Sequence, residues 1–450
     1  PFEYKYGVFD LSNNEFVCFE DGTNRVLPKS ITKDQLVIVN DGFAQLLNTN
    51  WKGTGVAIPV FSLRSKQSAG IGEFSDLKYL VDWSKKIGLK LIQLLPLNDT
   101  TATHSWLDSY PYAAISAFAL HPMYLRLQEV IKKDQANLIA PFQKQMDELN
   151  AMPEIDYDGV MQLKWQLLKL IYEENGKKEL ATAGFKKFFK QNEHWLVSYS
   201  AFSYLRDLHG TVDFNSWPTY SKFDQKEVDQ LTGAKSKTYH DIAFYYFVQY
   251  HLHLQLSESA KYAHENGVVL KGDIPIGVYR YGADAWQHPD LFHMDMQAGA
   301  PPDDFAVKGQ NWGFPTYNWE VMASNDYSWW KLRFEQMSFY FDAFRIDHIL
   351  GFFRIWSIPM DQVEGIMGRF VPAIPIAQQE LDKKGISVDM DRYTKPFINE
   401  AVLFTYFGYD NEYAKQHFVK SLQDGKYELL PNFQTQRSVE AYFKTLPNDE

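Results

Sequence analysis

Arg345 and Asp347, two residues apart, are the side chains of this chain best suited to covalent catalysis. They close an apolar run that begins at Phe341 and predicts a short buried strand. Side chains alternate between the two faces of a strand, so both charged groups are expected to point the same way. A neighbouring guanidinium favours the ionised carboxylate, the form that a covalent nucleophile needs. An isolated pair with this spacing is more often an ordinary buried ion pair, so the surrounding sequence has to decide.

Alternating strands and helices surround this pair. Near-continuous apolar runs predict strands at 55–61, 89–95, 268–273 and 341–347, with helices at 74–87, 245–266 and 328–338. A long helical excursion is expected over about 120–265. Polar residues follow the predicted strands at their carboxyl ends: Asn98, Asp99, Asp273 and Asp347.

The carboxyl end of the strands is where a (β/α)8 barrel carries its active site. A doubly wound sheet obeys the same rule, but it is expected to carry a glycine-rich phosphate loop after its first strand. Ser62-Leu63-Arg64-Ser65 stands there instead. The sequence therefore predicts an α/β fold of the (β/α)8 TIM-barrel type. Four βα units amount to the N-terminal half of such a barrel.

Three segments differ in pattern and predict the domain organisation. Residues 1–48 carry strand-like runs at 4–9, 16–20 and 36–39, separated by turn signals, and predict the last part of a β-sandwich. Residues 49–360 hold the barrel units. Residues 361–450 predict a helical insertion, with no apolar strand followed by a helix.

Composition narrows the class of protein. The net charge of −11 argues against nucleic acid or a membrane surface as the partner, and aromatic residues at 16% suit stacking on sugar rings. One cysteine, Cys18, excludes an internal disulfide and indicates a reducing compartment, the cytoplasm. The spacing of the histidines (His104, His121, His251, His253) is not that of metal ligands, so neither a metal nor a cofactor is expected.

Five ordered motifs carry a resemblance to one enzyme family. They are Ser109-Tyr110-Pro111-Tyr112 with Ser116-Ala117-Phe118-Ala119, Gly272-Asp273-Ile274-Pro275-Ile276-Gly277-Val278, Gly299-Ala300-Pro301-Pro302-Asp303-Asp304-Phe305, Gln310-Asn311-Trp312-Gly313-Phe314-Pro315-Thr316-Tyr317-Asn318-Trp319, and Phe344-Arg345-Ile346-Asp347-His348 with its continuation to Pro359. In this order they resemble the 4-α-glucanotransferases of glycoside hydrolase family 77, also called amylomaltases or disproportionating enzymes. The resemblance runs from about residue 49 to 450.

Further details resemble the plant-cytosolic-type subgroup of that family. This subgroup carries starch-binding domains before the barrel and an insertion after the nucleophile strand, which residues 1–48 and 361–450 resemble. Where such domains place a sugar-stacking Trp, this chain has Phe19. The chain begins at Pro1 without Met, and we expect it to be truncated at both ends.

The resemblance implies roles for single residues. Asp347 would attack the anomeric carbon of a glucosyl unit and Arg345 would orient it, transferring α-1,4-glucan units between maltooligosaccharides or glucans with retention. The residues implied to bind sugar are Tyr112, Asp273, Asp303, Trp312 and His348. Each has a plainer alternative: a core aromatic, a helix cap, a turn residue or a supporting histidine.

The catalytic set implied by the resemblance is incomplete in these 450 residues. The family's acid/base Glu and stabilising Asp follow later strands, and neither motif occurs after Asp347. Two alternatives to a transferase therefore stay open. One is a retaining α-glucan hydrolase, and the other is an inactive fragment that binds α-glucan. The sequence leaves the oligomeric state open.

Overall fold

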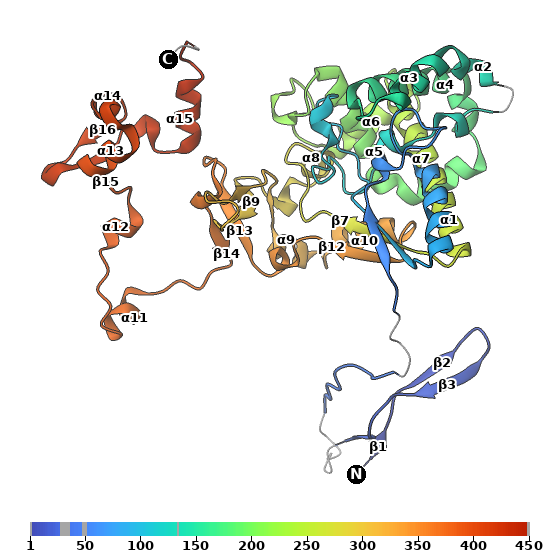
Figure 1. The fold of residues 1–450 in the computed structure, drawn as a ribbon, viewed down its shortest axis with the longest axis horizontal. Coiled ribbons are helices and arrows are strands. Elements are labelled where there is room, and N and C mark those ends of the chain that lie inside the picture. Colours follow the sequence, from blue (N-terminus) through green and yellow to red (C-terminus); the bar gives the residue numbers. More distant parts are fainter. Residues whose placement is uncertain (1, 28–36, 47–51, 133–134, 448–450) are drawn as a thin grey trace. The chain divides into compact units, whose positions relative to one another are not determined.

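The computed structural model describes residues 2–27, 37–46, 52–132 and 135–447 (Figure 1). The chain divides into two compact units, Pro1–Gly55 and Val56–Glu450. None of the helices in the described ranges is both long and apolar enough to cross a lipid bilayer.

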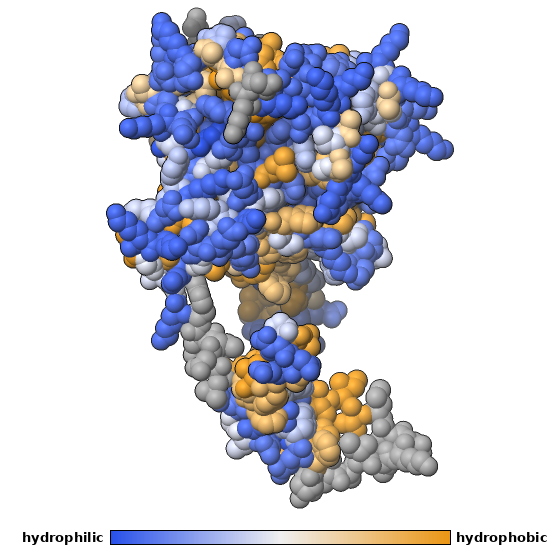
Figure 2. Space-filling model, turned by 90° about the vertical axis from the view of Figure 1, so that its right-hand side faces the viewer, coloured by the Kyte–Doolittle hydropathy of each residue, from blue (hydrophilic) through white to orange (hydrophobic). Residues whose placement is uncertain are grey.

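The first unit contains two short pairs of antiparallel strands. Its elements are β1 (Glu3–Tyr4) paired with β4 (Arg25–Val26), and β2 (Gly7–Asp10) paired with β3 (Glu15–Phe19). A buried carboxylate, Glu20, accepts two hydrogen bonds of 2.7 Å from Arg25 and anchors the pairs. Phe19 is 58% exposed, and Figure 2 shows hydrophobic side chains on the surface of this unit.

The third strand predicted for this unit, 36–39, is wrong for the part that the structure describes. Val37, Ile38 and Val39 have no regular secondary structure, and Leu36 lies outside the described residues. An apolar run forms a strand only where a neighbouring strand can pair with it, and no described strand pairs with these three residues.

A four-stranded sheet forms the centre of the second unit, in the order β5–β6–β7–β12. Its strands are β5 (Gly55–Ile58), β6 (Leu91–Leu94), β7 (Val269–Ile274) and β12 (Ala343–Ile346), and β7 runs parallel to both β6 and β12. Helices α1 (Leu77–Ile87) and α10 (Ser328–Ser338) lead into β6 and β12. The predicted alternation of strands and helices is confirmed.

The predicted helical excursion is also confirmed, and it lies between β6 and β7. Its helices are α2 (Ala136–Ile139), α3 (Gln143–Ala151), α4 (Tyr157–Glu179), α5 (Ala183–His209), α6 (Gln225–Thr232) and α7 (Tyr239–Glu265). Side-chain caps start several of them: Asp156 accepts a hydrogen bond from the Gly159 amide, and Thr182 accepts one from the Phe185 amide. Figure 1 shows these helices gathered into one cluster beside the sheet.

A sealed charge network joins this cluster to the segment before α1. Lys164 Nζ donates to Glu73 Oε1 (2.7 Å) and to the carbonyls of Met123 (2.6 Å) and Leu125 (2.8 Å). Arg126 donates to Glu73 Oε2 (2.8 Å) and to Asp76. All four charged side chains are buried, and each charge has an opposite charge beside it.

A second, antiparallel sheet follows, which the sequence did not predict. Its order is β10–β9–β13–β14, with β9 (Met296–Ala300), β10 (Gln310–Asn311), β13 (Ile355–Pro359) and β14 (Arg369–Val371). The neighbouring elements are α8 (Ala283–Gln287), β8 (Phe292–His293), β11 (Thr316–Tyr317) and α9 (Trp319–Ser324). Strands this short carry too few residues to show an alternating pattern in the sequence.

The segment 361–450 contains helices, as predicted, and also short strands that the sequence did not predict; its role as an insertion stays a prediction. Its described elements beyond β14 are α11 (Gln378–Lys383), α12 (Met390–Thr394), β15 (Ile398–Asn399), α13 (Glu400–Phe407), α14 (Asn411–His417), β16 (Val419–Ser421), β17 (Lys426–Leu429) and α15 (Gln436–Phe443). The three strands form an antiparallel sheet in the order β15–β17–β16. Leu403 and Val419 are among its buried residues.

Candidate active site

The pairing of β7 with β12 brings the predicted charged residues together. In this parallel pair Arg345 stands opposite Asp273, and the Asp347 amide donates to the Ile274 carbonyl just past the strand (3.2 Å). Residues opposite each other on neighbouring strands point to the same face. The carboxyl ends of the two strands therefore present two carboxylates and one guanidinium to one side.

Arg345 joins these groups through its two terminal nitrogens. Nη1 donates to Asp273 Oδ2 (2.6 Å) and to the Tyr112 hydroxyl (3.3 Å), and Nη2 donates to Asp347 Oδ1 (3.0 Å). The Tyr112 hydroxyl in turn donates to Asp273 Oδ2 (2.9 Å). Asp347 is held in position by charge-assisted bonding, and a quarter of its side chain stays open to solvent.

Asp273 is the buried member of the group. Burial raises the pKa of its carboxyl, and the Asp347 charge adds to this rise, while the hydrogen bonds from Tyr112 and Arg345 oppose it. Its Oδ1 is buried and has no hydrogen-bond partner among the described residues. Buried polar atoms of folded proteins nearly always have a partner, so this atom is out of the ordinary.

Tyr112 reaches the strands from the loop after β6. Burial raises the pKa of Tyr112 to about 12, so its hydroxyl keeps its proton and remains a donor. Within this loop, the Ile115 amide donates to the Asp99 carbonyl (2.8 Å). The Asp99 side chain is itself buried and accepts from Tyr199 (2.6 Å), so it supports the loop and does not reach the cleft.

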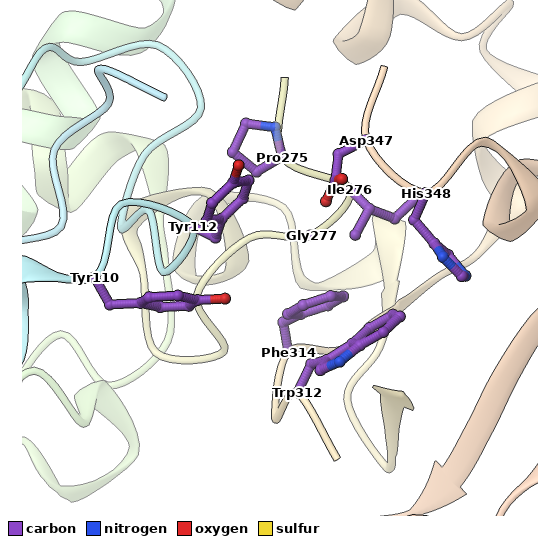
Figure 3. Close-up of a pocket in the computed structure, with 9 residues that line it drawn as sticks. All are labelled: Tyr110, Tyr112, Pro275, Ile276, Gly277, Trp312, Phe314, Asp347 and His348. Carbon is purple, nitrogen blue, oxygen red and sulfur yellow. The ribbon is translucent and has the colours of Figure 1, made fainter. Parts of the chain in front are cut away.

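A cleft of about 690 Å³ opens in front of Asp347, and we call it the first chamber (Figure 3). Its lining residues are Tyr110, Tyr112, Pro275, Ile276, Gly277, Trp312, Phe314, Asp347 and His348. Asp347 is the only carboxylic acid among these described residues. Aromatic rings and one carboxylate dominate the lining.

Trp312 and Phe314 form an aromatic wall of this chamber. Their ring centroids lie 5.7 Å apart with planes 25° from parallel, and Figure 3 shows the two rings side by side. A Cβ on Gly277 would lie 2.1 Å from Phe314 Cδ2, so only glycine lets the ring lie this close to the strand end.

His348, directly after Asp347, has an unusual backbone. Its φ of 46° and ψ of 53° place it in the left-handed region, which is uncommon for a residue with a side chain. The imidazole meets the Trp312 ring edge-on, with 4.9 Å between centroids. Burial lowers the pKa of His348 and the Asp347 charge opposes this, which favours a neutral ring that can donate or accept a hydrogen bond.

A second chamber of about 1140 Å³ adjoins the first. The two chambers share four aromatic residues: Tyr110, Tyr112, Trp312 and Phe314. Its other polar lining residues are Tyr279, Arg280, Tyr281, Gln297, Asn311 and Arg437. Together the chambers form a cleft whose lining extends from Asp347 to Arg437.

The structure brings together all the predicted site residues except Asp303. Asp347, Arg345, Asp273 and Tyr112 form one bonded group, and Trp312 and His348 line the same chamber. Asp303 is exposed and lines neither chamber. Its side chain accepts from the amides of Phe305 (2.9 Å) and Ala306 (2.6 Å) and closes its own loop.

Sequence reasoning missed several lining residues, among them Tyr110, Phe314 and Arg437. Tyr110 and Phe314 lie within motifs already singled out, where an aromatic one or two residues from a predicted sugar contact was the available signal. Arg437 has no such signal, because only the fold brings α15 to this cleft. Within the described ranges, no group of three or more His, Cys, Asp or Glu side chains is arranged to hold a metal ion.

Comparison with known proteins identifies the family. The family model of glycoside hydrolase family 77, described as 4-alpha-glucanotransferase, matches residues 58–427. The chain belongs to this family. A family 77 relative, a 4-alpha-glucanotransferase of Oryza sativa subsp. japonica, is 43% identical over 434 residues, or 93% of this chain and 45% of that protein. The 4-alpha-glucanotransferase of Chlamydia pneumoniae is 37% identical over 71% of this chain and 59% of its own length.

Solved structures of the family show the same fold. An amylomaltase from Streptococcus agalactiae, in complex with acarbose, superposes with a TM-score of 0.62 at 24% identity, covering 78% of this chain and 70% of that one. Corynebacterium glutamicum amylomaltase gives 0.59 at 23% identity, covering 71% and 44%. The predicted α/β fold of the barrel type is confirmed. The chain spans about half the length of the curated family 77 proteins that it matches.

Proposed function

We propose that this protein is a retaining 4-α-glucanotransferase in which Asp347 is the nucleophile. The observation that carries the proposal is the bonded group of Asp347, Arg345, Asp273 and Tyr112 at the carboxyl ends of β7 and β12. It stands inside the residues that match the family and faces a chamber with an aromatic wall. The substrates are α-1,4-glucans and maltooligosaccharides.

The reaction has two halves. An Asp347 oxygen bonds to the anomeric carbon of a glucosyl unit, the bond from that carbon to the 4-oxygen breaks, and the leaving oxygen takes up a proton. In the second half, the 4-hydroxyl of another glucan attacks the same carbon, loses its proton and releases the Asp347 carboxylate. Two inversions at one carbon retain its configuration.

The other residues of the cleft serve this chemistry by position and charge. Arg345 keeps the Asp347 oxygen aimed through the 3.0 Å bond, while Asp273 and neutral His348 offer hydrogen-bond partners to sugar hydroxyls. Trp312 stacks on a glucose ring. We assign Asp303 to the binding of the acceptor glucan only because its motif resembles that of the family. Its hydrogen bonds, from the amides of its own loop, are those of a residue that closes the loop.

A second candidate function rests on the lack of a second acid in the lining. Asp347 is the only carboxylic acid among the described residues of the first chamber, so no Glu there can protonate the leaving oxygen. The second candidate function is therefore the binding of α-glucan without turnover, for which this cleft suffices.

We further propose a cytoplasmic location, which suits a chain whose one cysteine, Cys18, cannot form an internal disulfide.

One experiment separates these readings. The 450-residue protein is incubated with maltotriose and the products are resolved by chromatography, with Asp347→Asn as the matched control. Glucose plus longer glucans supports transfer. Shortening without elongation replaces transfer by hydrolysis. No products, together with calorimetric binding of acarbose, which the Streptococcus agalactiae amylomaltase binds, supports the second candidate. Neither products nor binding overturns both.

A further inference from the structure

The second chamber continues the first through an unbroken aromatic surface, the four shared rings of Tyr110, Tyr112, Trp312 and Phe314. Beyond these rings its described lining holds amide, phenol and guanidinium groups and no carboxylic acid. Rings that stack and planar groups that donate hydrogen bonds are what a neutral chain of sugars needs. The chemistry of the chamber therefore fits a longer α-glucan chain.

Arg280, one of the two arginines of the second chamber, already uses its nitrogens in hydrogen bonds to backbone carbonyls. Nε and Nη1 donate to the carbonyls of Gly313 (3.1 Å) and Met294 (2.5 Å), and Nη2 donates to the Met296 carbonyl. The side chain is buried. Arg280 therefore holds the loops of this chamber together and has little capacity left for a ligand.

Arg437 is anchored by two hydrogen bonds and still has donors that bond to no described residue. Its Nε donates to the Met360 carbonyl (2.6 Å) and its Nη2 to Gln297 Oε1 (3.0 Å). Gln297 is buried and fixed by its own bonds to the carbonyls of Pro359 and Gln362, both 3.0 Å. Nη1 makes no hydrogen bond to any described residue, and its charged neighbour, Glu440 Oε2, is 3.9 Å away. Two-fifths of the side chain is exposed.

The helix that carries Arg437 is pinned at the same place. Gln436 Oε1 accepts from the amides of Val363 and Glu364, each at 2.8 Å, and the Arg437 amide donates to the Asp361 carbonyl (3.1 Å). Because α15 is tied to the loop after β13, the guanidinium is held before any ligand arrives. A donor held in place loses little conformational entropy on binding.

We propose that Arg437 determines specificity for chain length: it donates hydrogen bonds to the hydroxyls of glucose units that reach into the second chamber, which selects longer glucans over short ones. The site rests on the proposed function, since it extends the same cleft. Arg437 lies beyond residues 58–427, which match the family model, whereas the other lining residues of the second chamber lie within that range. It gives the segment after β14 a role in substrate choice.

Calorimetric binding of maltotriose and maltoheptaose to the 450-residue protein tests this role. Wild-type protein is expected to bind maltoheptaose more tightly than maltotriose. Arg437→Ala is expected to weaken maltoheptaose binding about tenfold, the size of one lost charged hydrogen bond, and to change maltotriose binding less than about twofold. The matched control is Arg392→Ala, whose guanidinium lies over the Phe397 ring in the same segment and lines neither chamber.

Arg437→Lys provides the second variant in case loss of the anchor unfolds the segment. Lysine keeps the charge and the aliphatic stem but cannot hold both anchors and present a planar fork, so we expect most of the preference for maltoheptaose to disappear. Equal weakening of both sugars, or none, in the folded variant overturns the Arg437 proposal and leaves the proposed function standing. Failure of wild-type protein to bind either sugar overturns both.

Discussion

Two groups of charged side chains in the second unit show how burial separates a structural network from a chemical one. The sealed network (Glu73, Asp76, Arg126 and Lys164) and the cleft network (Asp273, Arg345 and Asp347) both place carboxylates against cations at hydrogen-bond distance. They differ in how many donor and acceptor atoms remain without a partner and in how far the side chains are exposed.

In the sealed network every charged group has a partner of opposite charge. All three Lys164 protons have acceptors, and both Glu73 oxygens meet a cation. In the cleft network Arg345 is 39% exposed, Asp347 is 25% exposed, and Asp273 Oδ1 has no partner among the described residues. Exposure and unused bonding capacity, rather than charge itself, mark the group that can act on a ligand.

Breaking the sealed network should give the largest effect on stability. Lys164→Met leaves Glu73 with one cation and strips two carbonyls of their donor, so we expect the free energy of unfolding to fall by about 3–5 kcal/mol. Urea denaturation followed by tryptophan fluorescence measures it.

The control for that change is Lys78→Met, which removes an ion pair to Glu258 with side chains 28% and 65% exposed. Solvent-exposed pairs contribute little, so its cost should stay below about 1 kcal/mol. Equal losses in the two variants would contradict the distinction between sealed and open networks.

Asp284 sharpens the comparison because it is buried without an ion pair to any described residue. It accepts from the Ala117 amide (2.7 Å), and burial raises its pKa from 3.8 to about 6. A raised pKa stabilises the fold at low pH and loses that contribution as the pH rises through 6. Between pH 4 and 7 the stability of Asp284→Asn relative to wild type should rise by about 2 kcal/mol.

Denaturation at several pH values measures this effect, and the exposed Asp158→Asn serves as its control. If the difference in unfolding free energy between wild type and Asp284→Asn stays constant with pH, burial does not raise the pKa of Asp284.

Breaking the cleft network should affect turnover and leave stability nearly unchanged. Arg345→Met removes the donor that aims Asp347, and we expect the turnover of maltotriose to fall about 100-fold. Because Asp273 already has a raised pKa, it can take up a proton when the guanidinium is gone, so the stability cost should stay under about 1 kcal/mol. Steady-state kinetics and urea denaturation of one preparation test both halves, and a loss of stability like that of Lys164→Met would refute them.

The smallest effect is expected from Tyr112→Phe. It removes the hydroxyl that donates to Asp273 Oδ2 and keeps the ring, so stability should fall by about 1 kcal/mol. Tyr110→Phe, two residues away, loses a hydroxyl that bonds to no described residue and should change stability less. Thermal denaturation compares the two, and the reverse order would mean that Tyr112 does not support the network.

Much of the central sheet could be predicted because its strands lie within near-continuous apolar runs. The runs at 89–95, 268–273 and 341–347 contain β6, β7 and β12: β6 and β12 are each three residues shorter than predicted, and β7 has the predicted length, shifted by one residue. The strands of the two antiparallel sheets hold two to five residues, and such lengths show no periodicity. The isolated run at 37–39 shows the opposite error, an apolar pattern without a pairing partner in the described structure.

The same division applies to the cleft. Local spacing was enough to place Arg345 and Asp347 on one face, and the strand-end rule was enough to place Asp273 beside them. Asp303 lies in a motif that predicted sugar binding, but its side chain accepts hydrogen bonds from the amides of its own loop. Arg437 had no motif at all.

By itself the sequence determined where the main strands lie along the chain, the family motifs and the pair at the end of β12. Backbone geometry fixes where near neighbours point, which is why the pair could be predicted. Only the tertiary structure decided which polar atoms remain unused. Asp273 joins the bonded group through a strand register, and Arg437, 164 residues further along the chain, reaches the cleft through a pinned helix. Hydrogen bonds between such distant segments form only when the fold has brought both partners together, so no local pattern can encode them.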